Sequence, residues 1–305
     1  MRISRHALLI AILCCARAQE ANFSADVDVV TLLATARDAQ GLLAKNLTRD
    51  DFVVQEDGVP QTIRYFARES DLPLTIGLLV DTSNSQLHVL EPERQASYTF
   101  LGEILRESQD LAFLAHFDVR VEVLQGFTSS RKDLESALGQ LKVPVRLGTR
   151  LYDAIRDCSE NRMRKRSGRK AFILLSDGVD YGSKTSLGTA IEYAQRADTI
   201  VYSILFAEAP SPYRPFRSAV LAMSRSRGRR VMRRLAAETG GAFFEVAKEE
   251  PIEKIYAQIE ETLRNQYSLG YTPAQKGAKG QYHKIKLTAK QPGLIVQTRD
   301  GYYSK

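Results

Sequence analysis

The central part of the chain alternates between two hydrophobic patterns. Short apolar runs predict strands at 74–80, 110–117, 120–125, 171–176, 200–206 and 242–246. Apolar residues at helical spacing predict helices at about 86–107, 131–139, 150–161, 187–197, 229–239 and 251–264. Because strands alternate with helices, we expect an α/β fold with a doubly wound, mostly parallel six-stranded sheet. The link between the second and third strands is too short for a crossover, so that pair should be antiparallel.

The two flanks have a different residue pattern, which predicts short β-strands separated by turns. Strand-like runs occur at 27–36, 52–58 and 61–66 before the α/β region, and at 267–271, 283–289 and 294–298 after it. Each flank is too short to form a stable domain. We therefore predict that residues 23–70 and 266–305 pair into one smaller β-sandwich, with an α/β domain over 72–264 inserted between them. The stretch 208–228 is interpreted as a long loop that shapes the choice of partner.

The N-terminus has the pattern of an export signal. Arg2 and Arg5 precede an apolar stretch over 7–15, and a small-residue cleavage site ends at Ala18. We expect residues 1–18 to be removed, which places the mature protein outside the cell, in the periplasm or at the envelope. The apolar stretch is too short to span a bilayer, and no later segment qualifies as a transmembrane helix. Lipidation of Cys14 or Cys15 is a weaker alternative.

Charge and cysteine content limit the classes of function. Removing residues 1–18 lowers the formal net charge from +7 to +4 and leaves Cys158 as the one cysteine, so no intramolecular disulfide is expected. Basic residues gather at 162–170 and 214–234. In an exported chain we interpret them as solvated faces, or as contacts to acidic partners or the envelope, and we do not expect nucleic-acid binding.

Oxygen-bearing side chains follow two of the predicted strands. Asp81, Ser83 and Ser85 lie directly after the apolar run 74–80, and Asp177 follows the strand 171–176. Thr149 opens the helix that precedes that strand. If the two strands are neighbours, their carboxyl ends and the Thr149 loop share one rim of the sheet, where doubly wound folds bind ligands. Such hard oxygen donors suit a magnesium-like cation. A helix-capping role for the hydroxyls is the alternative.

With these motifs in place, the chain resembles the von Willebrand factor A-type domain and its metal-ion-dependent adhesion site (MIDAS). The resemblance covers 72–264, and the flanks resemble the bacterial secreted proteins called VWFA-related. It implies a metal site made by Asp81, Ser83, Ser85, Thr149 and Asp177, with Mg²⁺, or Mn²⁺ or Ca²⁺, as the ion. It further implies adhesion to a protein partner whose Asp or Glu side chain completes the coordination of the metal.

Two other functions are considered. One is an interaction scaffold whose metal site is structural or degenerate. The other is a metal-dependent hydrolase, which we do not favour. Ser83 stands where an aspartyl-phosphate enzyme of similar fold needs a second carboxylate, and the sequence has no nucleophile elbow. His88, His116 and His283 have no motif partner. We therefore expect no catalytic residues and no enzymatic activity.

Overall fold

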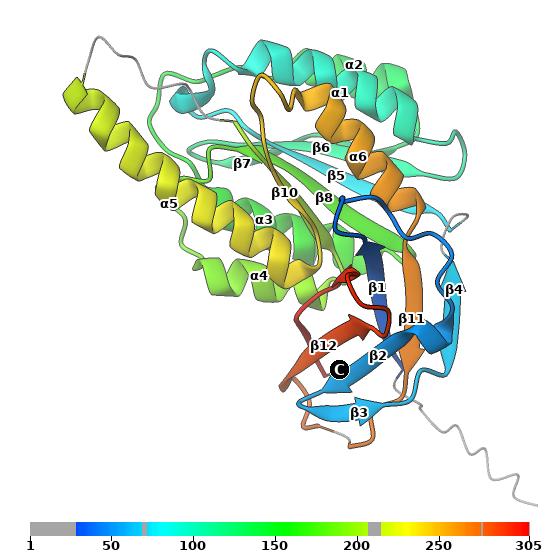
Figure 1. The fold of residues 1–305 in the computed structure, drawn as a ribbon. Helices are drawn as coiled ribbons and strands as arrows, with labels where there is room; N and C mark the ends of the chain where they lie inside the picture. The colour runs from blue at the N-terminus through cyan, green and yellow to red at the C-terminus, as the bar shows by residue number, and fades with distance from the viewer. Residues whose placement is uncertain (1–28, 69–71, 207–214, 276, 305) are drawn as a thin grey trace, which may run out of the picture.

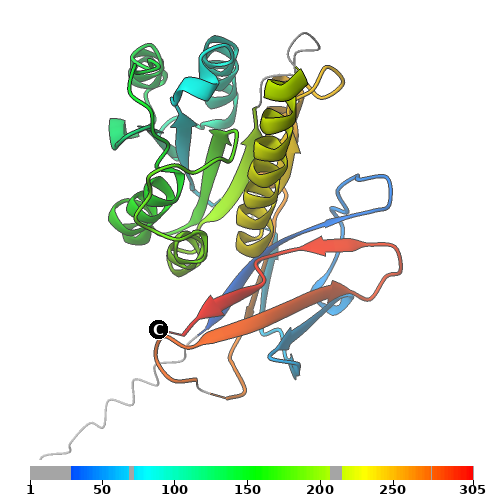
Figure 2. The ribbon, with the colours of Figure 1, turned by 90° about the vertical axis from the view of Figure 1, so that its left-hand side faces the viewer.

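The computed structural model describes residues 29–68, 72–206, 215–275 and 277–304, and within 215–221 it describes the backbone alone. It contains an α/β domain and a β-sandwich, and the sandwich lies at one end of the α/β domain (Figures 1 and 2). The predicted signal peptide, residues 1–18, falls outside the described residues. Among the helices that are described, none is long and apolar enough to span a bilayer.

A six-stranded sheet forms the centre of the α/β domain, as predicted. Its spatial order is β10-β9-β8-β5-β6-β7, and every neighbouring pair is parallel except β6 and β7, which are antiparallel. The order reverses beside β5, because β6 lies on one side of it and β8 on the other. The strand bounds are β5 (Leu74–Asp81), β6 (Leu111–Phe117), β7 (Val121–Thr128), β8 (Arg169–Ser176), β9 (Ile200–Leu205) and β10 (Phe243–Glu245).

Helices cover both faces of this sheet (Figure 1). One face packs against α1 (Leu90–Ile104), α2 (Arg131–Leu138) and α6 (Ile252–Arg264), and the other against α3 (Leu151–Asn161), α4 (Leu187–Arg196) and α5 (Pro215–Thr239). Within β5, Ile76, Leu78 and Val80 enter the first core and Leu79 enters the second. Buried strands therefore read as continuous apolar runs. Short 3-10 helices occur at Arg49–Asp51 (η1), Asn84–Gln86 (η2) and Met163–Lys165 (η3).

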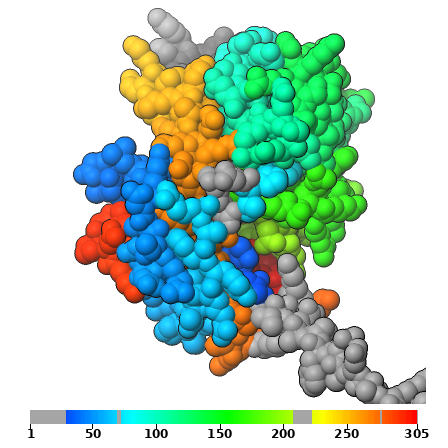
Figure 3. Space-filling model, turned by 90° about the vertical axis from the view of Figure 1, so that its right-hand side faces the viewer, coloured from blue at the N-terminus to red at the C-terminus, as the bar shows by residue number. Residues whose placement is uncertain are grey.

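The β-sandwich is made from both flanks, as the sequence predicted. One sheet has the order β13-β1-β11-β4 and the other β14-β12-β2-β3, and each contains strands from both ends of the chain. Figure 3 shows the blue-to-cyan and the orange-to-red segments packed into one body. The strands are β1 (Val30–Arg37), β2 (Phe52–Glu56), β3 (Val59–Gln61), β4 (Tyr65–Arg68), β11 (Tyr267–Tyr271), β12 (Tyr282–Ala289), β13 (Ile295–Gln297) and β14 (Gly301–Tyr303).

Two details of the sandwich differ from the prediction. The single strand expected at 61–66 is two strands in different sheets, since β3 pairs with β2 and β4 pairs with β11. Ile63 lies between them and is buried in the sandwich core, so the chain crosses from one sheet to the other there. The short strand β14 pairs with β12 and was not predicted, because three residues give too little alternation to detect.

The long loop predicted at 208–228 is wrong from residue 215 onward, because α5 begins at Pro215. Proline is compatible with the first turn of a helix, where its missing N–H would have no partner anyway. Three of the described basic side chains of α5, those of Arg225, Arg229 and Arg234, bind acidic neighbours. Arg225 and Arg229 both contact Glu245 Oε1, at 2.9 and 2.5 Å. This part of the basic stretch 214–234 is thus a helix with ion pairs rather than an open basic loop.

A buried charged group lies at the amino ends of the central strands, close to the points where the chain enters and leaves the α/β domain. Asp110 is fully buried and accepts hydrogen bonds from Leu74 N at 2.8 Å, Arg106 Nε at 3.0 Å and Arg264 Nη2 at 2.9 Å. Arg169, predicted as part of a solvated basic face, is also buried, and it donates to the carbonyls of Leu263 and, at 2.5 Å, of Leu72. These bonds fix the two points where the chain passes between the domains.

The environment of Asp110 predicts a pH-dependent contribution to stability. Burial acts to raise the pKa of Asp110, but the hydrogen bonds from Arg106, Leu74 and Arg264 together lower it from its ordinary 3.8 to about 2. The folded pKa lies below the unfolded one, so the stabilisation is complete above about pH 4 and is lost as the pH falls toward 2. Asp110→Asn should therefore cost about 2 kcal/mol at neutral pH. Urea unfolding of both proteins between pH 7 and pH 3 should show this difference shrinking below pH 4, whereas a constant difference would contradict the electrostatic origin.

Candidate functional site

The site lies where β5 and β8 end side by side. The two strands pair in parallel, with Val80 opposite Leu175, so Asp81 and Ser176 leave the sheet together. Ser176 Oγ donates a 2.6 Å hydrogen bond to Asp81 Oδ2. Because the sheet order reverses beside β5, this edge is the crevice in which doubly wound folds bind ligands. The sandwich lies at the other end of the sheet, where Arg169 at the amino end of β8 and Ser268 of the sandwich line one cleft.

The loop after β5 folds its oxygen atoms back toward this edge. Asp81 Oδ1 accepts a hydrogen bond from Ser83 N at 2.9 Å, and the hydroxyls of Ser83 and Ser85 lie 3.0 Å apart. Ser85 lies close enough to Asp177 for its hydroxyl to act to lower the pKa of that carboxyl group, against the larger effect of burial. Asp81 and Ser83 are buried, while Ser85 is exposed. The structure thus brings together four of the five residues predicted as ligands.

Thr149, the fifth, is placed on the same rim through its main chain. Thr149 and Tyr181 exchange two backbone hydrogen bonds of 2.8 Å, which tie the loop before α3 to the loop that carries Asp177. Arg150 N donates to Asp118 O at 2.9 Å and attaches the same loop to the end of β6. Thr149 is mostly buried, with 8% of its surface exposed.

Close packing against α5 holds the Asp177 loop. Asp177 Oδ1 accepts a hydrogen bond from Val179 N at 2.9 Å, and Gly178 has a φ of +75°, which favours glycine. A Cβ atom on Gly228 of α5 would lie 1.9 Å from the carbonyl oxygen of Asp177. Glycine is therefore required at position 228, inside the segment that the sequence reading treated as a loop.

The carboxyl groups of Asp81 and Asp177 lie close together and repel one another. Burial, followed by the negative charge of Asp177, raises the pKa of Asp81 to about 7, and burial also raises the pKa of Asp177. Two acidic groups held together in a buried place are costly unless a cation or a proton accompanies them. A divalent ion would relieve this cost, so the group passes a physical test for a cation site.

Glu93 of α1 is a third acidic group near this site, and the sequence reading missed it. It is 1% exposed, and burial and then the charges of Asp81 and Asp177 raise its pKa well above the ordinary value. In the described part of the chain, neither of its carboxyl oxygens has a hydrogen-bond partner. A signal was present, because Glu93 falls three residues after buried Leu90 and three before buried Ala96, on the apolar face of α1.

The donor set determines what the site can do chemically. Ser83, Ser85 and Thr149 offer neutral hydroxyl oxygens, so an ion among them keeps much of its charge and at least one exchangeable water. Such an ion attracts an external carboxylate.

Cys158 lies outside this site and is a possible nucleophile. It is buried, and burial raises the pKa of its thiol to about 12, which favours the unreactive protonated form.

The sequence comparisons identify no related protein. No protein-family model matches the chain, and no curated protein sequence matches it significantly.

Comparisons of structure give a clear answer for the fold. The von Willebrand factor type A structure from Catenulispora acidiphila matches with a TM-score of 0.50 and 12% identity, over 84% of this chain and 74% of that one. Proximal thread matrix protein 1 from the mussel byssus matches with a TM-score of 0.50 and 11% identity, over 76% of this chain. Its form with a zinc-occupied MIDAS motif matches with a TM-score of 0.51 and 12% identity, over 70% of this chain. This chain spans about half the length of the mussel protein. The α/β domain of this protein therefore has the von Willebrand factor A-type fold.

Proposed function

We propose that this protein is a divalent-cation-dependent protein-binding module of the adhesion type. The ion is held by Ser83, Ser85 and Thr149 with Asp81 and Asp177 in support, and a carboxylate from a protein partner takes one of its free positions. The observation that carries the proposal is the convergence of buried Asp81 and part-buried Asp177, which repel one another, with two hydroxyls at the β5–β8 edge. The zinc-occupied MIDAS motif of the mussel protein supports it as a precedent on the same fold.

The remaining parts of the proposal rest on the sequence. The export pattern of residues 1–18 makes the cell envelope or the outside of the cell the place of action. Mg²⁺ is the ion we favour, because all five side chains offer oxygen. We propose no enzymatic activity, since a metal hydrolase needs a base or nucleophile beside its ion, and Asp81 and Asp177 here accept hydrogen bonds that hold their own loops.

A cleft between the two domains favours a second candidate, an interaction scaffold. It encloses about 1400 Å³, and its described lining includes seven lysine or arginine residues against the single acid Asp198. An acidic partner could bind there without any metal. The two candidates respond differently to simple treatments, because EDTA abolishes binding at the MIDAS-like site, whereas added salt weakens binding in a basic cleft. In both tests, circular dichroism checks that the fold survives.

Direct metal titration tests the proposed site. We expect Mg²⁺ to bind residues 19–305 at one saturable site in isothermal titration calorimetry. The double variant Asp81→Ala, Ser83→Ala should bind at least about 100-fold more weakly, because it loses a carboxylate and a hydroxyl ligand. Asn84→Ala is a matched control in the same loop, since Asn84 is exposed and is not a proposed ligand. If the folded wild type fails to bind Mg²⁺, the scaffold becomes the better proposal.

Glu93 gives an independent test of the electrostatics. Glu93→Gln keeps the shape of the side chain and removes its ability to carry charge next to the ion. We expect the Mg²⁺ affinity to fall about tenfold, which corresponds to about 1.4 kcal/mol. Glu91→Gln on the exposed side of the same helix is the control and should bind like the wild type. An unchanged affinity in Glu93→Gln would show that this carboxyl group does not act on the ion.

A further inference from the structure

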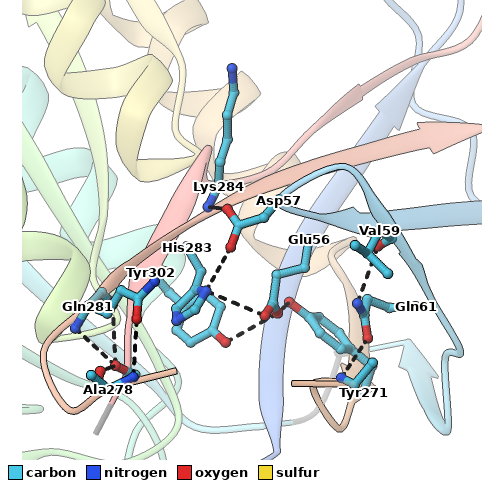
Figure 4. Close-up of polar contacts among 12 residues, drawn as sticks. Glu56, Asp57, Val59, Gln61, Tyr271, Ala278, Gln281, His283, Lys284 and Tyr302 are labelled. Atoms are coloured by element: carbon cyan, nitrogen blue, oxygen red, sulfur yellow. Dashed lines mark hydrogen bonds and ion pairs between the residues drawn. The ribbon is translucent and has the colours of Figure 1, made fainter. Parts of the chain in front are cut away.

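A second group of potential metal ligands lies in the β-sandwich, apart from the MIDAS-like site. Glu56 ends β2, Asp57 follows it in the turn to β3, and His283 lies on the neighbouring strand β12 (Figure 4). His283 Nδ1 lies 2.8 Å from Asp57 Oδ2 and 3.6 Å from Glu56 Oε1. One ligand atom from each of the three side chains falls within 4.8 Å of the others.

Hydrogen bonds to the outer oxygens orient both carboxylates toward the ring. Glu56 Oε2 accepts from Tyr271 Oη at 2.6 Å and from Tyr302 Oη at 3.2 Å, so its Oε1 is the oxygen nearer to His283 (Figure 4). Burial and the adjacent Glu56 raise the pKa of Tyr271, which keeps this hydroxyl protonated as a donor. Asp57 Oδ1 accepts from Lys284 N at 2.8 Å, which directs Oδ2 toward the ring. Outer partners of this kind are typical of metal ligands.

The imidazole ring is held in one position. It stacks on Tyr302, with 5.3 Å between ring centroids, and a Cβ on Gly277 would lie 2.2 Å from its Nε2. In the described part of the chain Nε2 has no hydrogen-bond partner, so the polar contacts of the ring are all made through Nδ1. Glu56 and His283 are both buried, whereas about half of the Asp57 side chain is exposed. Asp57 therefore gives an ion a route from solvent.

We propose that Glu56, Asp57 and His283 form a binding site for Zn²⁺ or a similar first-row transition ion. The ion takes the place of the proton between His283 Nδ1 and Asp57 Oδ2, and the ring proton moves to Nε2. Two carboxylates match its double positive charge, and an imidazole nitrogen selects such ions over Mg²⁺ and Ca²⁺. Asp57 and His283 are 226 positions apart, so the ion ties the N-terminal flank to the C-terminal flank.

The test uses protein in which the MIDAS-like site has been removed. In the background Asp81→Ala, Ser83→Ala, we expect calorimetry to show one equivalent of Zn²⁺, with binding unaffected by millimolar Mg²⁺. Adding His283→Asn should weaken Zn²⁺ binding at least about tenfold, because a first-row ion loses its nitrogen ligand. Adding His88→Asn instead is the matched control, since His88 is exposed and lies outside the group, and it should leave the binding unchanged.

A second measurement needs no change in the sandwich and so remains decisive if His283→Asn fails to fold. Zn²⁺ added to the same double variant should shift the imidazole nitrogen resonances of His283 in ¹⁵N NMR and leave those of His88 in place. It should also raise the thermal midpoint, because an ion that binds only the folded chain stabilises it. Absence of Zn²⁺ binding by the folded double variant, or an equal affinity in His283→Asn, would overturn the proposal.

Discussion

The burial of acidic groups at the carboxyl edge of β5 and β8 is the constraint on which the candidate site depends. Asp81 is fully buried, its neighbour Asp177 repels it, and Glu93 approaches from α1 with no hydrogen-bond partner in the described residues. A chain folded for stability alone would place apolar side chains here, because uncompensated buried carboxyl groups are costly. The arrangement becomes favourable when a cation is present. The cost of burying these acids is thus the physical argument for metal binding.

The sequence predicted the elements that bring the site together, because their signals are strong and local. The apolar run 74–80 followed by Asp81, and the run 171–176 followed by Asp177, required only that two buried strands be neighbours. Parallel pairing then placed both aspartates on one edge. Pairing of the flanks was predictable for a related reason, since neither flank can bury its own apolar face, and β1 with β11 and β2 with β12 do so jointly.

What the sequence concealed depends on contacts between distant segments. The helix at 215–228 was hidden by proline, serine and arginine, and the need for Gly228 is visible only when α5 approaches the Asp177 carbonyl. Glu93 is an ordinary helix residue until the packing of α1 buries it. His283 had no motif partner because Glu56 and Asp57 reach it through the β2–β12 pairing, across the whole inserted domain. Pairing of this kind leaves no short motif in the chain.

The two groups of ligands differ in chemistry, and the difference follows from how each part of the fold is built. The rim of the α/β domain is made of loops whose hydroxyls and carboxylates lie at the edge of the sheet, with Asp81 and Ser83 buried and Ser85 exposed, so an ion there would keep a position open for a partner. The sandwich group joins two paired strands, with Glu56 and His283 buried and held by Tyr271 and Tyr302. An ion there would therefore hold the two strands together rather than bind a partner. Oxygen donors beside an exposed position suit recognition, and a nitrogen donor between strands from opposite ends of the chain suits structural closure. Under the two proposals, donor type and burial select a different ion at each place, and each ion serves a separate purpose.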